Sequence, residues 1–360
     1  VGCQRLGEML EEFGLDDLEE LGDHICDRSR EAVLGEIAKL PKGSWSNTMV
    51  TDGYDQPIEL AATVTVSDEG IHVDYTGTSP AAGRGINVPL SYTTAYTVFG
   101  LACIVGSRIP NNAGSLAPLT VSAPEGCIVN APKPAPVCSR HVIGQMLPDV
   151  VFGCLHQAIP HRVPAEGTSC LWNLNVRGKV KGGAEGNYGF SMAVTSNGGT
   201  GARPRADGLS ATAYPSGVKG TPVEIAEQIT PLLFWRKELR PDSGGAGRTR
   251  GGHGQIIEIE SRIGEPFELL AAYDRIDHPP RGRDGGEDGA AGSVAFKSGR
   301  KLPGKGFIMV PPSERLVVTT PGGGGLGPPS ERDNTAIARD RASGLVGAEA
   351  LRSSYGRGDA

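Results

Sequence analysis

The sequence predicts an α+β fold in which β-rich mixed sheets, packed helices and long glycine-rich loops share one chain. Three observations predict it. Helical periodicity runs through residues 6–39, apolar and polar residues alternate in many short segments further on, and the 53 glycines gather in clusters between apolar runs. A chain of 360 residues is long enough to bury a substantial core. The glycine clusters therefore indicate loops of a folded protein and not low-complexity sequence.

Three helical regions are predicted from apolar spacing. The first covers Leu6–Lys39, is broken in two by Gly14 and ends before Pro41-Lys42-Gly43. The second covers Ser91–Gly106, with Ser91 as the expected N-cap. The third covers Val137–Ile159, and Pro148 should kink or split it because proline lacks the amide that an interior helical position needs. A terminal helix is predicted over Glu331–Arg341, and Ala348–Tyr355 is a candidate for a short one.

Strands are predicted where side chains alternate or where short apolar runs lie between turns. Ile58–Val66 and Ile71–Thr76 alternate well, and Asp68-Glu69-Gly70 between them should form the hairpin turn. Further strands are predicted at 168–176, 187–195, 256–259, 267–273, 290–296 and 316–319. We divide the chain into an N-terminal region of helices and meander (1–136), a β-rich region with glycine-rich loops (137–320) and a C-terminal glycine loop, helix and tail (321–360).

Composition and charge disfavour several classes of protein. The net charge of −6 and the lack of a long basic run disfavour nucleic-acid binding. The longest apolar run, near Val98–Val105, is too short to span a bilayer, so no membrane role is expected. Seven scattered cysteines without a CxxC pair argue against a disulfide framework and favour the cytoplasm. The histidines show no HExxH spacing, and no metal ligand is assigned in this chain.

The stretch around which we expect the remainder to be arranged is Arg240–Gly254, which is dense in glycine and carries three arginines. Such a run provides backbone at positive φ and lets the chain approach other groups closely. Arg248 and Arg250 lie on one side if the chain is extended, and Asp242, next to Ser243, is near enough to pair with one of them. The alternative interpretation is a plain surface loop.

Three other glycine-rich loops occur. In Thr76–Asn87, Ser79 is a candidate for contacting a ligand through its backbone and Asn87 through its side-chain amide; the alternative is a connector between strand and helix. The loop Gly198–Gly208 ends in the turn Asp207-Gly208, and Pro321–Gly327 is the last of the set. Residues 281–292 are expected to be mobile. None of these loops has the spacing of a nucleotide-binding fingerprint.

Taken together, the motifs resemble those of the hydantoinase B/oxoprolinase family. The matching pieces follow the same order over nearly the whole chain: Asp74-Tyr-Thr-Gly-Thr-Ser, Gly85-Ile-Asn87, Asn112-Ala-Gly, Ala123-Pro-Glu-Gly, Asn130-Ala-Pro, Pro134-Ala-Pro-Val, Gly199-Thr-Gly-Ala, Asp207-Gly208, Pro222-Val-Glu224, Arg240–Gly254, Pro321–Gly327 and Glu331-Arg-Asp. One departure is Gly327-Pro328-Pro329, where the family usually has an aspartate after the glycines.

The resemblance implies a B-type subunit that works with an A-type hydantoinase/oxoprolinase subunit or domain. Together such proteins open small cyclic amides (hydantoins, 5-oxoproline, lactams) with ATP, while relatives carboxylate acetone. ATP is then expected on the partner subunit. A divalent metal is expected on His and Asp ligands in a preceding portion of the family, to which no residue of this chain can be matched. We therefore expect a truncated fragment, the product of a remnant gene, or a second chain that supplies the missing portion.

Two hypotheses for function follow. In the first, the chain is the C-terminal scaffold of an ATP-dependent cyclic amidohydrolase subunit, works as a hydrolase only in its complex and is inactive alone. The loops at 76–87, 198–207 and 242–254 would shape the pocket or the subunit contact. Arg248 or Arg250 would neutralise a carboxylate or phosphate, oriented by Asp242. In the second, the chain is a non-catalytic assembly module, or belongs to an enzyme similar to acetone carboxylase.

Overall fold

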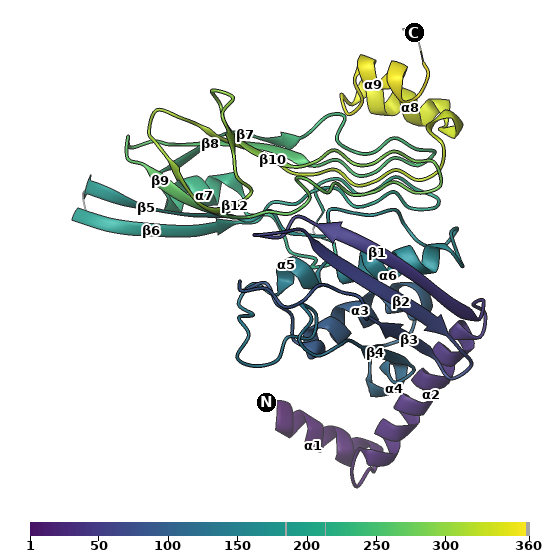
Figure 1. The fold of residues 1–360 in the computed structure, drawn as a ribbon. Helices are drawn as coiled ribbons and strands as arrows, with labels where there is room; N and C mark the ends of the chain where they lie inside the picture. The colour runs from purple at the N-terminus through teal and green to yellow at the C-terminus, as the bar shows by residue number, and fades with distance from the viewer. Residues whose placement is uncertain (184–185, 213, 358–360) are drawn as a thin grey trace.

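The computed structural model describes residues 1–183, 186–212 and 214–357. Helices and three sheets form its regular structure, which confirms the predicted α+β class (Figure 1). The helices are α1 (Gly2–Phe13), α2 (Glu19–Ile37), α3 (Leu90–Val105), α4 (Ala113–Leu116), α5 (His141–Gly144), α6 (Leu147–His156), α7 (Val223–Ile229), η1 (Pro329–Glu331), α8 (Asn334–Ala342) and α9 (Ala348–Ser353). The strands are β1 (Gly43–Thr51), β2 (Ile58–Val66), β3 (Ile71–Asp74), β4 (Leu119–Ser122), β5 (Leu174–Gly183), β6 (Gly186–Val194), β7 (Leu232–Leu239), β8 (Gln255–Ser261), β9 (Phe267–Ala272), β10 (Ser293–Phe296), β11 (Lys301–Leu302), β12 (Lys305–Val310) and β13 (Leu316–Thr319).

The N-terminal helical region is split where the sequence predicts. Gly14 follows α1 in the left-handed conformation, with φ of 63°, and its amide closes the end of that helix. Helix α2 then continues to Ile37, whose side chain is fully buried. Within the described residues, no helix is both long and apolar enough to cross a membrane.

The first sheet has the strand order β1-β2-β3-β4, antiparallel except for the β3–β4 pair. Strand β2 buries every second residue, as its alternation predicts. The predicted hairpin turn is confirmed, because the amide of Ser67 bonds to the carbonyl of Gly70 at 2.9 Å. Helix α6 packs on β1 and β2, and α3 packs on α6 and β4. The sequence suggests that a second region begins after residue 136. Helix α6 lies beyond that boundary, but it packs on the first sheet.

Helices α3 and α6 cross closely because small residues meet there. A Cβ atom placed on Gly100 of α3 would lie 3.0 Å from the Cα atom of Pro148. Pro148 itself occupies the first turn of α6 and separates α6 from α5, so the predicted division of the 137–159 helix is confirmed. The predicted N-cap of α3 is wrong: Pro89 occupies that position, and no side chain caps the first turn.

The other two sheets have the orders β11-β10-β13-β8-β7 and β12-β9-β5-β6, and both are antiparallel. Their buried residues, such as Val318 and Leu269, belong to the same apolar core as those of the first sheet. Strand β12 is absent from the predicted strands. Its residues Phe307–Val310 are all apolar, so the letters show no alternation, although Phe307 and Met309 are exposed while Ile308 and Val310 are buried.

The glycine-rich loops other than 76–87 come together in one array of extended chains, which runs away from these two sheets in Figure 1. We call this array the glycine bundle. It is formed by residues 198–202, 206–210, 243–254, 281–290 and 321–327. Their backbones bond to one another from several sides, whereas a β-strand bonds only to the neighbour on either side.

Residues 322–325 show why the bundle needs glycine. Their four successive amides bond to carbonyls of four other residues: Gly322 to Ala290, Gly323 to Gly252, Gly324 to Glu166 and Gly325 to Glu287, at 2.8–3.0 Å. A Cβ atom on any of the four would lie 1.6–2.2 Å from the carbonyl oxygen of a neighbouring segment. The chains therefore approach so closely that no side chain fits between them.

Two expectations about these loops are wrong. The glycines of Arg240–Gly254 were expected to adopt positive φ, but none of them does. In this stretch Asp242 has a positive φ, of 56°. Glycine is needed there for close approach and not for a left-handed backbone. Residues 281–292 are also not a free loop, because amides such as those of Arg283 and Glu287 bond to Gly325 and Ala246 inside the bundle.

We predict that Gly323→Ala lowers the free energy of unfolding by about 3 kcal/mol or more, because a Cβ atom 1.9 Å from the carbonyl oxygen of Thr200 must push two backbones apart. Gly7→Ala is the matched control. Gly7 lies in α1 with open space around it, so alanine should change stability by about 1 kcal/mol or less, in the favourable direction. Chemical denaturation measures both. Equal stability of the two variants would contradict the packing described for the bundle.

Candidate functional site

Two of the predicted site residues, Asp207 and Arg250, are joined in a mostly buried network with Arg332 and Asp340. Arg332 donates to both oxygens of Asp207, at 2.7 and 2.8 Å, and to Asp340 Oδ2 at 2.6 Å. Arg250 Nε donates to Asp340 at 3.1 Å, and the backbone amide of Arg250 donates to Asp207 at 2.8 Å. We call these four residues the Asp207 network.

Within the Asp207 network, the hydrogen bonds favour the charged forms of Asp207 and Arg332. Burial alone would raise the pKa of the Asp207 carboxyl, but the hydrogen bonds from Arg332 and from the Arg250 amide outweigh it and lower that pKa. Burial likewise opposes the charge on Arg332, yet the bonds to Asp207 and Asp340 raise the pKa of its guanidinium. Each arginine therefore has its counter-ion inside the protein, and α8, which carries Asp340, is held against the bundle.

The two arginines proposed to meet an anionic ligand differ in their access to solvent. Arg250 is 5% exposed and is neutralised by Asp340. The side chain of Arg248 is 48% exposed, and Glu331, which pairs with it at 3.5 Å, is equally open to solvent. Arg248 is therefore the arginine of this pair that a second molecule can reach.

Asp242 does not pair with an arginine within the described part of the chain. Its carboxylate accepts from the amide of Gly347 at 2.7 Å, which ties the segment between α8 and α9 to the bundle. The neighbouring Ser243 is fully buried, donates to the carbonyl of Arg240 at 2.6 Å and accepts from the amide of Gly254 at 3.0 Å. Both side chains thus stabilise the loop in which they lie.

Ser79 and Asn87 also serve the chain itself. The Ser79 amide, which was expected to contact a ligand, donates to the carbonyl of Glu59 at 2.9 Å, and Ser79 Oγ accepts from the amide of Glu59. Asn87 is fully buried; its oxygen accepts from the amide of Ala82, and its nitrogen donates to the carbonyls of Ala82, Arg84 and Pro136. The Asn87 amide is therefore occupied in closing the 76–87 loop and is not free to contact a ligand. This loop lies apart from the bundle and lines a small hollow of about 180 Å³.

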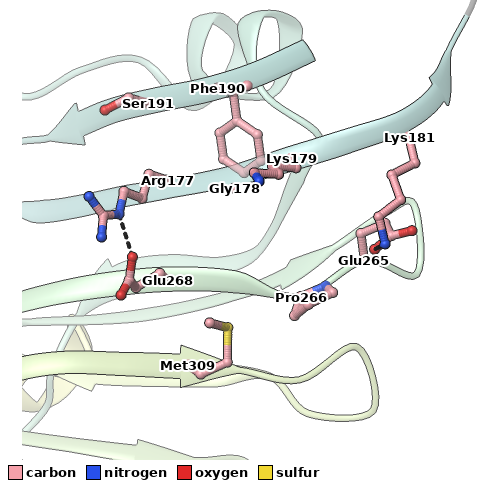
Figure 2. Close-up of a pocket in the computed structure, with 11 residues that line it drawn as sticks. Arg177, Gly178, Lys179, Lys181, Phe190, Ser191, Glu265, Pro266, Glu268 and Met309 are labelled. Carbon is pink, nitrogen blue, oxygen red and sulfur yellow. Dashed lines mark hydrogen bonds and ion pairs between the residues drawn. The ribbon is translucent and has the colours of Figure 1, made fainter. Parts of the chain in front are cut away.

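A broad hollow of about 660 Å³ lies on the sheet β12-β9-β5-β6 (Figure 2). Four of its charged side chains are paired, Arg177 with Glu268 and Lys181 with Glu265 at 3.2 Å, and Lys179 also lines it. Met309 lies beside them, and the exposed ring of Phe307 packs under the Arg177 guanidinium, 5.1 Å from its carbon. This face offers carbon surface with paired charges, which suits contact with another protein better than catalysis.

A second cavity, of about 350 Å³, lies between helices α3 and α6 and the glycine bundle. We call it the inner cavity; its lining includes Cys103, Phe152, Arg162, Thr200, Arg203 and Tyr214. Of the three loops expected to shape a pocket, 198–207 does line this cavity, whereas 76–87 and 242–254 do not contribute to its lining. Asp149, at 1% exposure, also lines it. Burial, reinforced by Glu166 and opposed by the hydrogen bond from Ser169, raises the pKa of the Asp149 carboxyl.

We find no site for the divalent metal that the resemblance implies. Among residues 1–183, 186–212 and 214–357, no group of three or more His, Cys, Asp or Glu side chains has an arrangement that holds a metal ion. The residues present therefore do not fit that group, and no chemical step is assigned to a metal held by this chain.

We predict that Asp340→Ala lowers the free energy of unfolding by about 3–5 kcal/mol, because it leaves Arg250 and Arg332 buried with one carboxylate between them. The control is Glu31→Ala, which removes an exposed partner of Arg28 and should cost about 0.5 kcal/mol or less. Denaturation curves give both values. Similar losses for the two variants would show that the network is not a structural anchor.

Comparison with known proteins places this architecture in a family. The sequence model described as Hydantoinase B/oxoprolinase matches residues 1–329. The chain is 30% identical to a putative B-type subunit of a D-/L-hydantoinase from Pseudomonas sp., over 99% of this chain and 62% of that protein. It is also 30% identical to 5-oxoprolinase 1 of Arabidopsis thaliana, over 91% of this chain and 26% of that protein. The chain thus spans about three fifths of the first relative and about a quarter of the second.

Two solved structures share the fold. The ATP-dependent caprolactamase from Pseudomonas jessenii superposes with a TM-score of 0.83 over 99% of this chain and 64% of that chain, at 23% identity. Acetone carboxylase superposes with a TM-score of 0.72 over 91% of this chain and 51% of that chain, at 17% identity. With the family match over more than nine tenths of its length, the chain belongs to the hydantoinase B/oxoprolinase family.

Proposed function

We propose that this chain is the C-terminal part of a B-type subunit that opens small cyclic amides with ATP, in complex with an A-type partner. The observation that carries the proposal is the family match over residues 1–329. A relative named as the B-type component of a hydantoinase and a similar fold in an ATP-dependent caprolactamase support it. Hydantoins, 5-oxoproline and lactams are the substrates to be tested.

The chemistry assigns different tasks to the two proteins of the complex. A ring amide is a poor electrophile, so its carbonyl must be activated before water can attack it. ATP, expected on the A-type partner, supplies that activation. This chain contributes a rigid framework, because its bundle and the Asp207 network hold loops from five parts of the sequence in fixed positions. We therefore expect no ring opening by this chain alone.

Arg248 is the residue of the Arg240–Gly254 loop that we assign to an intermolecular contact. Its guanidinium is half exposed, while its Glu331 partner lies at the long distance of 3.5 Å and is itself exposed. An exposed pair of this kind is worth little in water and is easily exchanged. A carboxylate or phosphate, on the substrate or on the partner surface, can accept two hydrogen bonds from the planar guanidinium.

An alternative function is that of a non-catalytic assembly module. The exposed residues Phe307 and Met309 of β12, in the sheet β12-β9-β5-β6, favour it, because large apolar side chains on a sheet face often mark a protein contact. The two functions differ in whether the assembled complex turns over substrate.

The decisive experiment combines the chain with an A-type protein from the same organism. We expect a stable complex by size-exclusion chromatography, and ATP-dependent ring opening of hydantoin, 5-oxoproline or ε-caprolactam once the remaining B-type portion is also present. A stable complex without turnover would favour the assembly module. ATP use that depends on acetone and bicarbonate would point to carboxylation, and the lack of any complex would refute both functions.

In the active complex, Arg248→Ala should weaken substrate or partner binding by about tenfold, the value of one charged hydrogen-bonded contact. The matched control is Arg300→Ala, which removes an exposed arginine at the turn between β10 and β11. KM and the dissociation constant of the complex are the measurements. If Arg248→Ala leaves both unchanged, the assignment of this arginine is wrong.

A further inference from the structure

We propose that the inner cavity binds a small monocarboxylate with a compact apolar body. The volume of about 350 Å³ is at the lower end of the range for small-molecule sites. Its walls come from α3, from α6 and the segment after it, and from the 198–212 part of the chain. The proposal is independent of the ring-opening function, because its test needs neither ATP nor a partner protein.

The body of the ligand is set by the carbon lining. Ile104 and Phe152 form the wall on the helical side, while Pro164, Pro204 and Leu209 form the wall beside the bundle. Burying an apolar ring against such side chains is favourable by about 25 cal/mol per Å². A ligand without carbon surface, such as acetate, would leave most of this lining without contact.

The charge of the ligand is set by two arginines. Arg162 Nη2 donates to the carbonyl of Ile104 at 2.7 Å, and Arg203 donates through Nε and Nη2 to the carbonyl of Asp207 at 3.0 and 2.7 Å. Neither forms an ion pair with a carboxylate among the residues that the structure describes. Both guanidinium groups are therefore held in place by neutral carbonyls and keep further N–H donors, and Arg162 also lies close enough to Glu36 for an electrostatic interaction.

Tyr214 adds a third donor. Its hydroxyl is buried and makes no hydrogen bond of normal geometry within the described residues, although it interacts weakly with the Cys103 thiol. Burial raises the pKa of this phenol, so it keeps its proton and remains a donor. The nearby Cys103 thiol is only a weak acceptor. A ligand oxygen that reaches this hydroxyl after a small side-chain rotation would be a stronger acceptor than the thiol.

Asp149 is the one acidic side chain among the described residues of the lining. Its Oδ2 accepts from the amide of Gly167, which also lines the cavity, at 2.8 Å and from the hydroxyl of Ser169. Because burial raises the pKa of this carboxyl, its negative charge is disfavoured. The uncommitted side-chain groups of the lining are thus mainly donors, which suits an acceptor with two oxygens.

The test measures binding of cyclohexanecarboxylate to the purified chain by titration calorimetry, without ATP or a partner. We expect saturable binding with one site. Cyclohexanecarboxamide, with the same shape but no charge, and acetate, with no ring, should each bind at least about tenfold more weakly. Equal binding of the amide and the acid, or no saturable binding of the acid, would overturn the proposal.

Variants locate the site. Cys103→Trp places a large side chain in the cavity from an exposed position of α3 and should weaken binding by about tenfold or more; Cys3→Trp on α1 is the matched control. Arg203→Met should cost about tenfold, with partial recovery in Arg203→Lys, and Tyr214→Phe about threefold. Unfolding curves confirm that each variant is folded. Wild-type affinity in folded Cys103→Trp would show that the ligand binds elsewhere.

Discussion

The structure depends on close contact between backbones that carry no side chains. In the glycine bundle, successive amides of residues 322–325 bond to different neighbouring segments, so hydrogen bonding extends in three dimensions instead of within a sheet. Five distant parts of the sequence meet in this way. Helices α3 and α6, the two upper sheets and the C-terminal helices all lie next to these segments (Figure 1). The inner cavity is lined by residues of α3, of α6 and of the bundle.

The arginine side chains on the two sides of the bundle have different kinds of hydrogen-bond partner. Toward α8, the Asp207 network pairs each buried guanidinium with a carboxylate and so fixes the last helices in place. Toward the helical layer, Arg162 and Arg203 are held by carbonyl groups instead. In the Asp207 network the charged groups neutralise one another and stabilise the fold. Arg162 and Arg203 instead keep N–H donors that a ligand can reach. This difference separates the structural arginines from the candidates for ligand contact.

Elements with a strong local signal could be predicted from the sequence. Gly14 and Pro148 divide helices because of their own backbone chemistry, and β2 alternates because one of its faces is buried. Strand β12 could not be found, since both of its faces carry apolar residues. The bundle could not be predicted either, because glycine has no side chain and therefore gives no period from which partners are inferred.

The site was predictable only in part, for reasons of sequence distance. Asp207 and Arg250 were singled out, but Asp340, which neutralises Arg250, lies 90 residues further along the chain. Asp242 was expected to fill that role because it is near in sequence, yet a carboxylate pairs with whatever the fold brings close. The inner cavity had no local signal, because Asp149 lies within an apolar helix and Tyr214 within an irregular segment.

The bundle also constrains how this protein can change over generations. Any missense mutation of a glycine codon introduces a residue with at least one more carbon atom. At Gly322–Gly325 that carbon has nowhere to go. Substitutions at these positions are therefore rarely tolerated. New properties must arise instead from the helices, the sheet faces and the residues that line the cavity.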